Sequence, residues 1–423
     1  MFFLEILEYI NYLVAIIFSV CYAYQIIYIP VALFAKFKKQ SPLSPVPRHR
    51  YAVMICARNE ENVIGELLES LSLQSYPSEN ITVFVAADNC TDNTATIARL
   101  HGAVVYERND LHLVGKGYAL EYLLDCIKRD YGDIFDGYFV FDADNILKRD
   151  YIEQMDRTFS EGYDIITSYR NSKNYGDNWI SAGYALWFLR ESVYLNHARH
   201  VLGTSCAVSG TGFLFSRRIL NTQGGWPYHL LTEDIEFSVA NITSGEKIGF
   251  CPHAVLYDEQ PTTFRQSWRQ RMRWAKGYLQ VFRKHGFDLI KGCFKGRFAC
   301  FDMTMAIMPA IILTVISFIS SAALSVIGLL NGEDLMIAVV SVLQNLASAY
   351  LALFSIGLIT TLTEWKHIHT SPIKKLLYTI TFPLFMFTYI PISFCALFAK
   401  VTWKPIEHRV SGKKLMFKND SAA

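Results

Sequence analysis

The chain has 423 residues, of which 52% are hydrophobic and 14% aromatic, and its formal net charge is +2. This composition is too apolar for an ordinary soluble protein and too charged for a membrane bundle alone, so we expect one soluble domain and several membrane spans. No stripe of Lys and Arg interleaves with aromatic residues, so no nucleic-acid partner is expected. The nine scattered cysteines include no C-x-x-C pair and indicate buried thiols in a reducing compartment, not a zinc site or disulfides.

The first apolar stretch, residues 13–35, is nearly free of charge and long enough, at ~23 residues, to span ~30 Å of hydrocarbon. It is too long for a cleaved signal peptide, and acidic residues precede it. The residues after it are basic: Lys36, Lys38, Lys39, Arg48 and Arg50. The positive-inside rule therefore predicts that Met1 lies outside and the chain from Lys36 onward lies in the cytoplasm.

Residues 53–287 contain no comparable apolar stretch, and short apolar runs alternate there with amphipathic ones, which is typical of an α/β domain. We predict parallel core strands at 51–56, 81–87, 103–107 and 137–141. Helices are predicted between them at 60–73, 91–100 and 116–129.

Three more apolar stretches follow Arg297, at about 298–330, 335–362 and 376–398. Glu333 and Asp334 between the first two indicate an outside loop, and Lys366, Lys374 and Lys375 before the third indicate an inside loop. Three simple crossings would leave the tail outside, although it is basic (Lys400, Lys404, Arg409, Lys413, Lys414 and Lys418). The last stretch contains Pro383 and Pro391, so one stretch is open to being a broken, re-entrant or interfacial element. The predicted regions are an N-terminal span (1–40), an α/β domain (41–290), a C-terminal membrane region (291–400) and a basic tail (401–423).

A pair of carboxylates leaves the end of a predicted strand in the sequence FVFDADN, which contains Asp142 and Asp144. Ligands of parallel α/β sheets bind beyond the carboxyl ends of the strands. Carboxylate oxygens there suit Mg²⁺ or Mn²⁺, which takes substrate phosphates as further ligands. The alternative is a solvated turn.

Asp88 ends another predicted strand in the same way and could accept hydrogen bonds from a nucleobase or ribose. Asp92 is expected instead to interact with the backbone amides at the start of the next helix. Further along, Thr232, Glu233 and Asp234 stand at a predicted helix start, where they could be an ordinary cap. In the catalytic interpretation, Asp234 is a general base that accepts a proton from an acceptor hydroxyl.

The segment FRQSWRQRMRWAKGY places Gln270, Arg273, Trp274 and Gly277 on one face if it is helical. An arginine there can bind a diphosphate bidentately, and an indole can stack on a sugar ring. A basic amphipathic helix lying on anionic lipid is the rival interpretation, and the two are compatible.

The order of these motifs, Asp88, Asp142 with Asp144, Thr232-Glu233-Asp234 and Gln270-Arg271-Met272-Arg273-Trp274, resembles the family 2 membrane glycosyltransferases. This group contains the cellulose, chitin, hyaluronan and poly-N-acetylglucosamine synthases, and the resemblance covers about residues 50–290. It implies a Rossmann-like GT-A fold, a cytoplasmic catalytic domain in a multi-pass protein of the cell membrane, and a UDP-sugar donor.

The resemblance also implies the site residues. Asp88 would contact the nucleobase, Asp142 the ribose or diphosphate, and Asp144, with Asp142, the divalent ion. Asp234 would be the catalytic base, while Gln270, Arg273 and Trp274 would bind the donor diphosphate and the acceptor sugar. Lys116 would be a basic contact to the nucleotide, with an ordinary surface lysine as the equal alternative. Val208–Arg218, with Gly210 and Gly212, would be an acceptor segment.

A single base without a second carboxylate nucleophile is consistent with direct displacement and inversion, although a retaining route stays open. The first expectation for the product is a growing polysaccharide. The chain has fewer apolar stretches than chain-secreting members usually have, so transfer of one sugar to a glycolipid or polyprenyl carrier is the alternative. A third possibility is a non-catalytic nucleotide-sugar-binding subunit of a synthase complex, and an accessory subunit is a possible partner.

Overall fold

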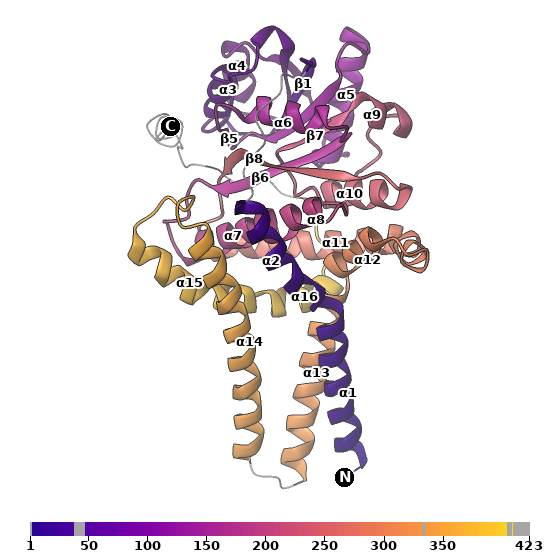
Figure 1. Ribbon diagram of the computed structural model, residues 1–423, viewed down its shortest axis with the longest axis vertical. Coiled ribbons are helices and arrows are strands. Elements are labelled where there is room, and N and C mark those ends of the chain that lie inside the picture. Colours follow the sequence, from indigo (N-terminus) through magenta and orange to yellow (C-terminus); the bar gives the residue numbers. More distant parts are fainter. Residues whose placement is uncertain (1, 38–46, 332–334, 404–407, 409–423) are drawn as a thin grey trace.

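The computed structural model describes residues 2–37, 47–331, 335–403 and 408. Lys38, Lys39, Glu333, Asp334 and most of the basic tail therefore lie outside the described residues. Among the residues described, eight strands form one mixed sheet with the order β3-β2-β1-β4-β7-β6-β8-β5 (Figure 1). The strands are β1 (Tyr51–Ala57), β2 (Ile81–Asp88), β3 (Val104–Arg108), β4 (Gly137–Asp142), β5 (Ile146–Leu147), β6 (Ile165–Ser172), β7 (Phe213–Ser216) and β8 (Ile248–Asp258).

The four predicted strands are confirmed as β1 to β4, which pair in parallel. β7 runs antiparallel to both β4 and β6 and so joins this half to the second one. The predicted helices are also present, although two of them begin three to four residues later than predicted, as α3 (Ile64–Ser72) and α4 (Thr94–Leu100). Parallel strands are buried on both faces, which explains why their sequences are nearly continuous apolar runs.

Alternate residues of β1 face two separate cores. Tyr51, Val53 and Ile55 belong to the core beneath α3, α4 and α6 (Tyr151–Ser160). Ala52 and Met54 belong to the larger core on the other face. The helices on that face are α5 (Lys116–Tyr131), α7 (Trp179–Arg190), α8 (Ala198–Val201) and α10 (Glu233–Ser244). The short elements η1 (Ser78–Asn80), η2 (Glu191–His197, π-helical) and α9 (Arg217–Gln223) complete the globular part.

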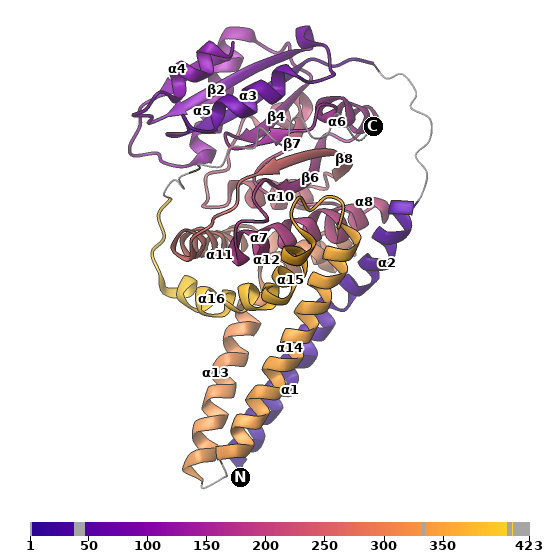
Figure 2. The ribbon, with the colours of Figure 1, turned by 90° about the vertical axis from the view of Figure 1, so that its left-hand side faces the viewer.

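A layer of helices lies below the sheet (Figures 1 and 2). It consists of α2 (Tyr24–Phe37), α11 (Phe264–Phe294), α12 (Phe298–Ile307), α15 (Pro372–Phe387) and α16 (Tyr389–Phe398). The last apolar stretch of the sequence is thus broken at Thr388, and its two halves lie across the foot of the globular part, which confirms that one stretch is a broken element. The fully buried Arg271 of α11 donates hydrogen bonds to Thr388 Oγ1 at 2.6 Å and to the Phe385 carbonyl at 3.2 Å.

Three long helices project from this layer in one direction: α1 (Phe2–Tyr22), α13 (Pro309–Leu330) and α14 (Leu335–Thr363) (Figures 1 and 2). They expose large apolar side chains such as Val20, Leu330 and Leu351. By length and composition, three helical stretches of the described chain could cross a membrane, at 12–36, 346–363 and 372–398. The third of these is the broken α15–α16 stretch.

Asp302 of α12 joins α2 and α8 to the layer below the sheet. Its carboxylate accepts hydrogen bonds from Arg199 at 2.7 and 2.8 Å, from Tyr24 at 2.7 Å and from Tyr28 at 2.8 Å. The side chains of Arg199 and Asp302 are 4% and 2% exposed. A buried charge pair with every partner in place fixes the relative position of these helices, because breaking it leaves an uncompensated charge.

Glu364, directly after α14, ties the projecting helices to the sheet. It pairs with Lys36 at 2.6 Å and accepts a hydrogen bond from Tyr169 of β6 at 2.6 Å. Lys36, which the sequence placed among the basic residues after the first apolar stretch, is therefore part of a specific contact between the ends of α2 and α14. The predicted boundary at residue 290 falls within α11.

Candidate active site

The carboxyl ends of β2, β4 and β8 and the start of α10 open onto one cavity of about 720 Å³. The eight residues predicted for catalysis, donor and metal binding all line this cavity: Asp88, Lys116, Asp142, Asp144, Asp234, Gln270, Arg273 and Trp274. Of the predicted acceptor segment, Ser209 and Gly210 line it, whereas Gly212 does not. Strand ends collect polar groups at one edge of a parallel sheet, so the sequence positions and the fold agree.

Asp142 is the last residue of β4, and its carboxylate pairs with Lys116 Nζ. Lys116 Nζ also donates to the Gly210 carbonyl at 2.7 Å. The backbone N–H of Asp142 donates to Thr211 Oγ1 at 2.9 Å, which fixes the strand end against the 209–212 loop. The Lys116 side chain, at the start of α5, is 13% exposed and is held against the end of β4, so it is not a freely solvated surface lysine.

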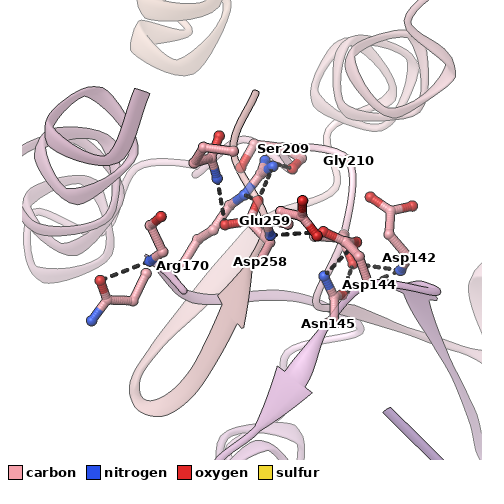
Figure 3. A network of polar contacts seen from close by, with 12 residues as sticks. Asp142, Asp144, Asn145, Arg170, Ser209, Gly210, Asp258 and Glu259 are labelled. Carbon is pink, nitrogen blue, oxygen red and sulfur yellow. Dashed lines mark hydrogen bonds and ion pairs between the residues drawn. The ribbon is translucent and has the colours of Figure 1, made fainter. Parts of the chain in front are cut away.

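Asp144 lies two residues further on and is 4% exposed. One of its oxygens accepts the Glu259 backbone N–H at 2.7 Å, and the other accepts Asn145 Nδ2 at 3.3 Å (Figure 3). These bonds fix the direction of the carboxylate. Burial alone would raise the pKa of Asp144, but His408 and Lys173 lower it below the ordinary value.

Asp258 was not predicted as a site residue, although it is the last residue of β8, just as Asp142 is the last residue of β4. It pairs with Arg170, which also donates to the Ser209 carbonyl at 2.7 Å (Figure 3). Burial raises the pKa of Asp258 to about 6, and the charges of Asp144 and Asp142 add to that effect while Arg170 opposes it. Three carboxylates thus concentrate negative charge at one end of the cavity.

This charge concentration fits a divalent cation, since carboxylate oxygens are the preferred ligands of Mg²⁺ and Mn²⁺. Within the described ranges, no three His, Cys, Asp or Glu side chains already converge as a ready ligand set.

Asp88 ends β2 and is 4% exposed. Its carboxylate accepts a hydrogen bond from Arg108 at 2.7 Å, so one oxygen is committed to a buried ion pair. Asp92 behaves as expected for a helix-start carboxylate, because it accepts the Thr94 N–H at 3.0 Å.

Asp234 stands in the first turn of α10 and faces the 209–212 loop. A Cβ atom placed on Gly210, whose φ is +82°, would lie 3.7 Å from Asp234 Oδ2. Burial raises the pKa of Asp234, while the Ile235 N–H, Lys116 and Arg273 oppose the rise. Burial and the charge of Asp234 raise the pKa of the neighbouring Glu233 to about 7.

Thr232 does not cap α10, in contrast to the capping interpretation. Its Oγ1 is buried and makes no hydrogen bond among the described residues. The reason is its contact with α11: a Cβ atom on Gly277 would lie 2.5 Å from Thr232 Oγ1. The close approach of α11 to the start of α10 therefore requires a glycine at 277.

Of the four residues predicted to share one face of α11, Gln270, Arg273 and Trp274 line the cavity, whereas Gly277 packs against Thr232. Arg273 Nη1 donates to the Leu231 carbonyl at 2.9 Å, and Gln270 Oε1 is buried without a partner in the described chain. Trp274 packs edge-on against Tyr184 at 5.7 Å between ring centroids. Gln270 thus has unused hydrogen-bonding capacity next to the arginine.

The chain after α16 returns to this cavity. Trp403 lies 5.6 Å from the Arg58 guanidinium, and His408 Nδ1 lies 3.0 Å from Glu60. Burial alone would lower the pKa of His408, but Asp144 and Glu60 raise it to about 10. Sequence reasoning missed this contact because residues so far apart in sequence leave no local pattern.

The opposite end of the cavity is apolar and lies among the projecting helices. Phe18 of α1, Leu353 and Ile356 of α14, and Ile390 of α16 line it. A single cavity therefore connects the carboxylates at the sheet edge with apolar side chains of the membrane-type helices.

Comparisons with known proteins agree with this arrangement. The family model described as "Glycosyltransferase like family 2" matches residues 47–277. The chain is 28% identical over 245 residues to the beta-monoglucosyldiacylglycerol synthase of Synechocystis sp., covering 56% of this chain and 50% of the relative. It is 24% identical over 246 residues to the poly-beta-1,6-N-acetyl-D-glucosamine synthase of Staphylococcus aureus, covering 56% and 57%. The chain thus spans about half the length of these curated relatives.

Among solved structures, the mannosyltransferase PcManGT from Pyrobaculum calidifontis, in complex with GDP-Man and Mn²⁺, matches with a TM-score of 0.56. The match covers 93% of this chain and 99% of that one at 16% identity, so it supports the fold alone. The family match extends over more than half of the chain and includes every predicted site residue. The protein belongs to glycosyltransferase family 2, has a GT-A-like fold and is a glycosyltransferase.

Proposed function

We propose that this protein transfers one sugar from a nucleoside-diphosphate sugar, with inversion, to a hydroxyl group of a membrane lipid. The observation that carries the proposal is the single cavity, which has Asp142 and Asp144 at one end and apolar side chains of α1 and α14 at the other. A soluble donor would enter at the sheet, and a lipid acceptor would enter from the bilayer.

The donor end carries the charges that a diphosphate requires. Lys116 and Arg273 line the cavity near the carboxylates, and an arginine can bind a diphosphate bidentately. Asp88 is the proposed contact to the nucleoside. The structure of PcManGT contains GDP-Man, a nucleoside-diphosphate sugar. The resemblance to the family 2 membrane synthases favours a UDP-sugar as the donor of this protein.

The metal ion of this reaction is proposed to be Mg²⁺ or Mn²⁺, held by Asp144 and Asp142. When bound, it would neutralise negative charge on the diphosphate leaving group. Lys116 and Arg273 would stabilise the same charge from the protein side.

Asp234 is the proposed general base. Burial raises its pKa and makes it a better proton acceptor, while the nearby cations help to keep it ionised near neutral pH. It would accept the proton of the acceptor hydroxyl as the hydroxyl oxygen attacks the anomeric carbon and the nucleoside diphosphate leaves. Direct attack by the acceptor inverts the anomeric configuration.

The proposed topology follows from the positions of the helices. α1, α13 and α14 would cross the membrane, while α2, α12, α15 and α16 would lie at its cytoplasmic surface. With α16 at the surface and not across it, the tail stays on the cytoplasmic side, where Trp403 and His408 contact the catalytic domain. This arrangement removes the conflict between three simple crossings and a basic tail.

A growing polysaccharide, our first expectation from sequence, is the second candidate acceptor, and the Staphylococcus aureus relative supports it. The apolar lining of the cavity beyond Asp234 favours a lipid, because glycan hydroxyls would lose water there without gaining partners.

The test is sugar transfer from a panel of radiolabelled nucleotide sugars by purified protein in liposomes with Mg²⁺ or Mn²⁺. We expect label in the lipid extract from one donor. Asp234→Asn should lower transfer by about 10³-fold or more, on the order of a lost general base and its altered charge, while equilibrium donor binding stays intact. Label in a water-soluble polymer would favour the second candidate, and full activity of Asp234→Asn would contradict the role of the base.

A further inference from the structure

A further carboxylate, Glu191, lines the cavity in addition to the residues already assigned. It is the first residue of η2, a π-helical segment of seven residues that directly follows α7. A π-helical turn is rare and frequently occurs at functional sites, since it redirects side chains relative to a regular helix. The π-helical segment therefore indicates that the direction of the Glu191 side chain serves a function.

Glu191 has no protein partner within the described part of the chain, although three arginines lie near it. Each arginine is committed elsewhere: Arg170 to Asp258, Arg199 to Asp302, and Arg190 to Gln25 Oε1 at 2.8 Å. Burial raises the pKa of Glu191, and the three arginines only oppose that rise. A carboxylate that faces a cavity without a partner costs stability, and such groups are typical of ligand sites.

Aromatic side chains surround this part of the cavity. Trp187 and Phe188 come from α7, Tyr278 from α11, and Tyr389 from α16. Tyr278, Glu191 and Asp234 all line this cavity. Burial raises the pKa of Tyr278, and the charges of Glu191 and Asp234 add to that rise. Aromatic faces beside a carboxylate suit a polyol, because the rings pack on C–H groups while the carboxylate accepts hydrogen bonds from adjacent hydroxyls.

The same arrangement disfavours an anionic acceptor. A phosphate head group next to Asp234 would share the cavity with two carboxylates, Asp234 and Glu191. Two of the arginines near Glu191 are already neutralised by Asp258 and Asp302, so the like charges would repel the phosphate. The cations at the opposite end, Lys116 and Arg273, are proposed contacts of the donor diphosphate.

We infer that Glu191 is an acceptor-binding residue, which accepts hydrogen bonds from the hydroxyls of an uncharged lipid head group and positions one of them at Asp234. The acceptor class is thus a neutral lipid with a glycerol or sugar head group, and lipid phosphates are excluded. This inference rests on the proposed function and adds the acceptor's chemistry to it.

The test compares Glu191→Gln with the unaltered protein in liposomes that contain diacylglycerol, a monoglycosyl diacylglycerol or a polyprenyl phosphate. Because hydrogen bonds to a charged group are worth ~1.5–3 kcal/mol, we expect the acceptor KM of Glu191→Gln to rise by about tenfold or more. Its donor KM and its donor binding should stay unchanged. Glu161→Gln, at an exposed glutamate after α6, is the matched control and should leave both KM values unchanged.

Two results would overturn the inference: an unchanged acceptor KM in Glu191→Gln, or use of the polyprenyl phosphate by the unaltered protein at least as well as the neutral lipids. The second result needs no variant and so holds even if Glu191→Gln does not fold. Transfer to no lipid at all would overturn the proposed function as well, whereas transfer to a neutral lipid with no effect of Glu191→Gln would overturn the inference alone.

Discussion

At the residue scale, the site is a set of buried charges held by few direct bonds. Asp142 and Asp258 have cationic partners, and Asp144 is oriented by the Glu259 N–H. No other side chain donates a hydrogen bond to Asp234 among the described residues, and the backbone N–H of Ile235 is a donor to it. The carboxylate is therefore open to the proposed acceptor hydroxyl. This difference in partners is consistent with the proposed roles, which are binding for Asp142 and Asp144 and general base for Asp234.

The raised pKa of Asp234 predicts an acid limit for the reaction. The base must be ionised, and its pKa lies above the usual value of 3.8, so activity should fall as the pH drops through that raised value. A profile of kcat/KM against pH for the lipid acceptor checks this prediction. An acid limit in the range of an ordinary exposed aspartate would contradict it.

The sequence alone predicted those cavity-lining residues whose placement follows from a strand end or a helix face. Asp142, Asp144 and Asp88 follow strands, and Gln270, Arg273 and Trp274 share a helix face, so periodicity was sufficient to bring each group together. Glu191, Arg170 and His408 were missed because a π-helical turn, a mid-sheet arginine and a distant return of the chain have no short-range signature. The ion pair of Lys116 with Asp142 could likewise not be predicted, because it depends on how α5 packs beside the end of β4.

At the element scale, α11 connects the candidate site to the layer of helices below the sheet. Gly277 allows it to contact Thr232 before Asp234, and Arg271, three residues before Trp274, holds the break between α15 and α16. The capping interpretation of Thr232 failed for this reason, because a tertiary contact took the side chain away from the helix start.

Asp302, with its partners Arg199, Tyr24 and Tyr28, is expected to contribute most to the stability of the packing of α2 and α8 against α12. Asp302→Asn should destabilise the protein by about 3–5 kcal/mol, because it leaves Arg199 as a buried charge without its partner. Thermal unfolding in detergent measures the effect. Tyr28→Phe, which removes one hydrogen bond of the same cluster, is the matched control and should cost about 1 kcal/mol. Equal, small effects of the two substitutions would contradict the assignment.

At the scale of the whole molecule, a GT-A-like α/β domain lies above a layer of helices, and three long helices project from that layer on the other side (Figure 2). Hydropathy predicted the apolar stretches, but it did not distinguish α13 from α15–α16, since both are apolar. Their packing distinguishes them: α15 and α16 contribute fully buried side chains such as Phe382 and Ile392, whereas the far ends of α13 and α14 expose large apolar side chains such as Leu330 and Leu343.

The proposed topology predicts opposite sides for the two ends of α14. Asn331→Cys, between α13 and α14, should react with a membrane-impermeant maleimide in intact cells, and Lys366→Cys should react only after permeabilisation. The unaltered chain, with its own cysteines, gives the background. Labelling of Lys366→Cys in intact cells would contradict a cytoplasmic catalytic domain.

The central claim is inverting transfer of one sugar to a membrane lipid, and the lipid product itself tests it most directly. Purified protein in liposomes would be supplied with its donor, and the extracted product would be analysed by mass spectrometry and by NMR of the anomeric proton. The account predicts a lipid that carries one added sugar in the anomeric configuration opposite to that of the donor. A product with retained configuration, or a polymer in the aqueous phase, would contradict it.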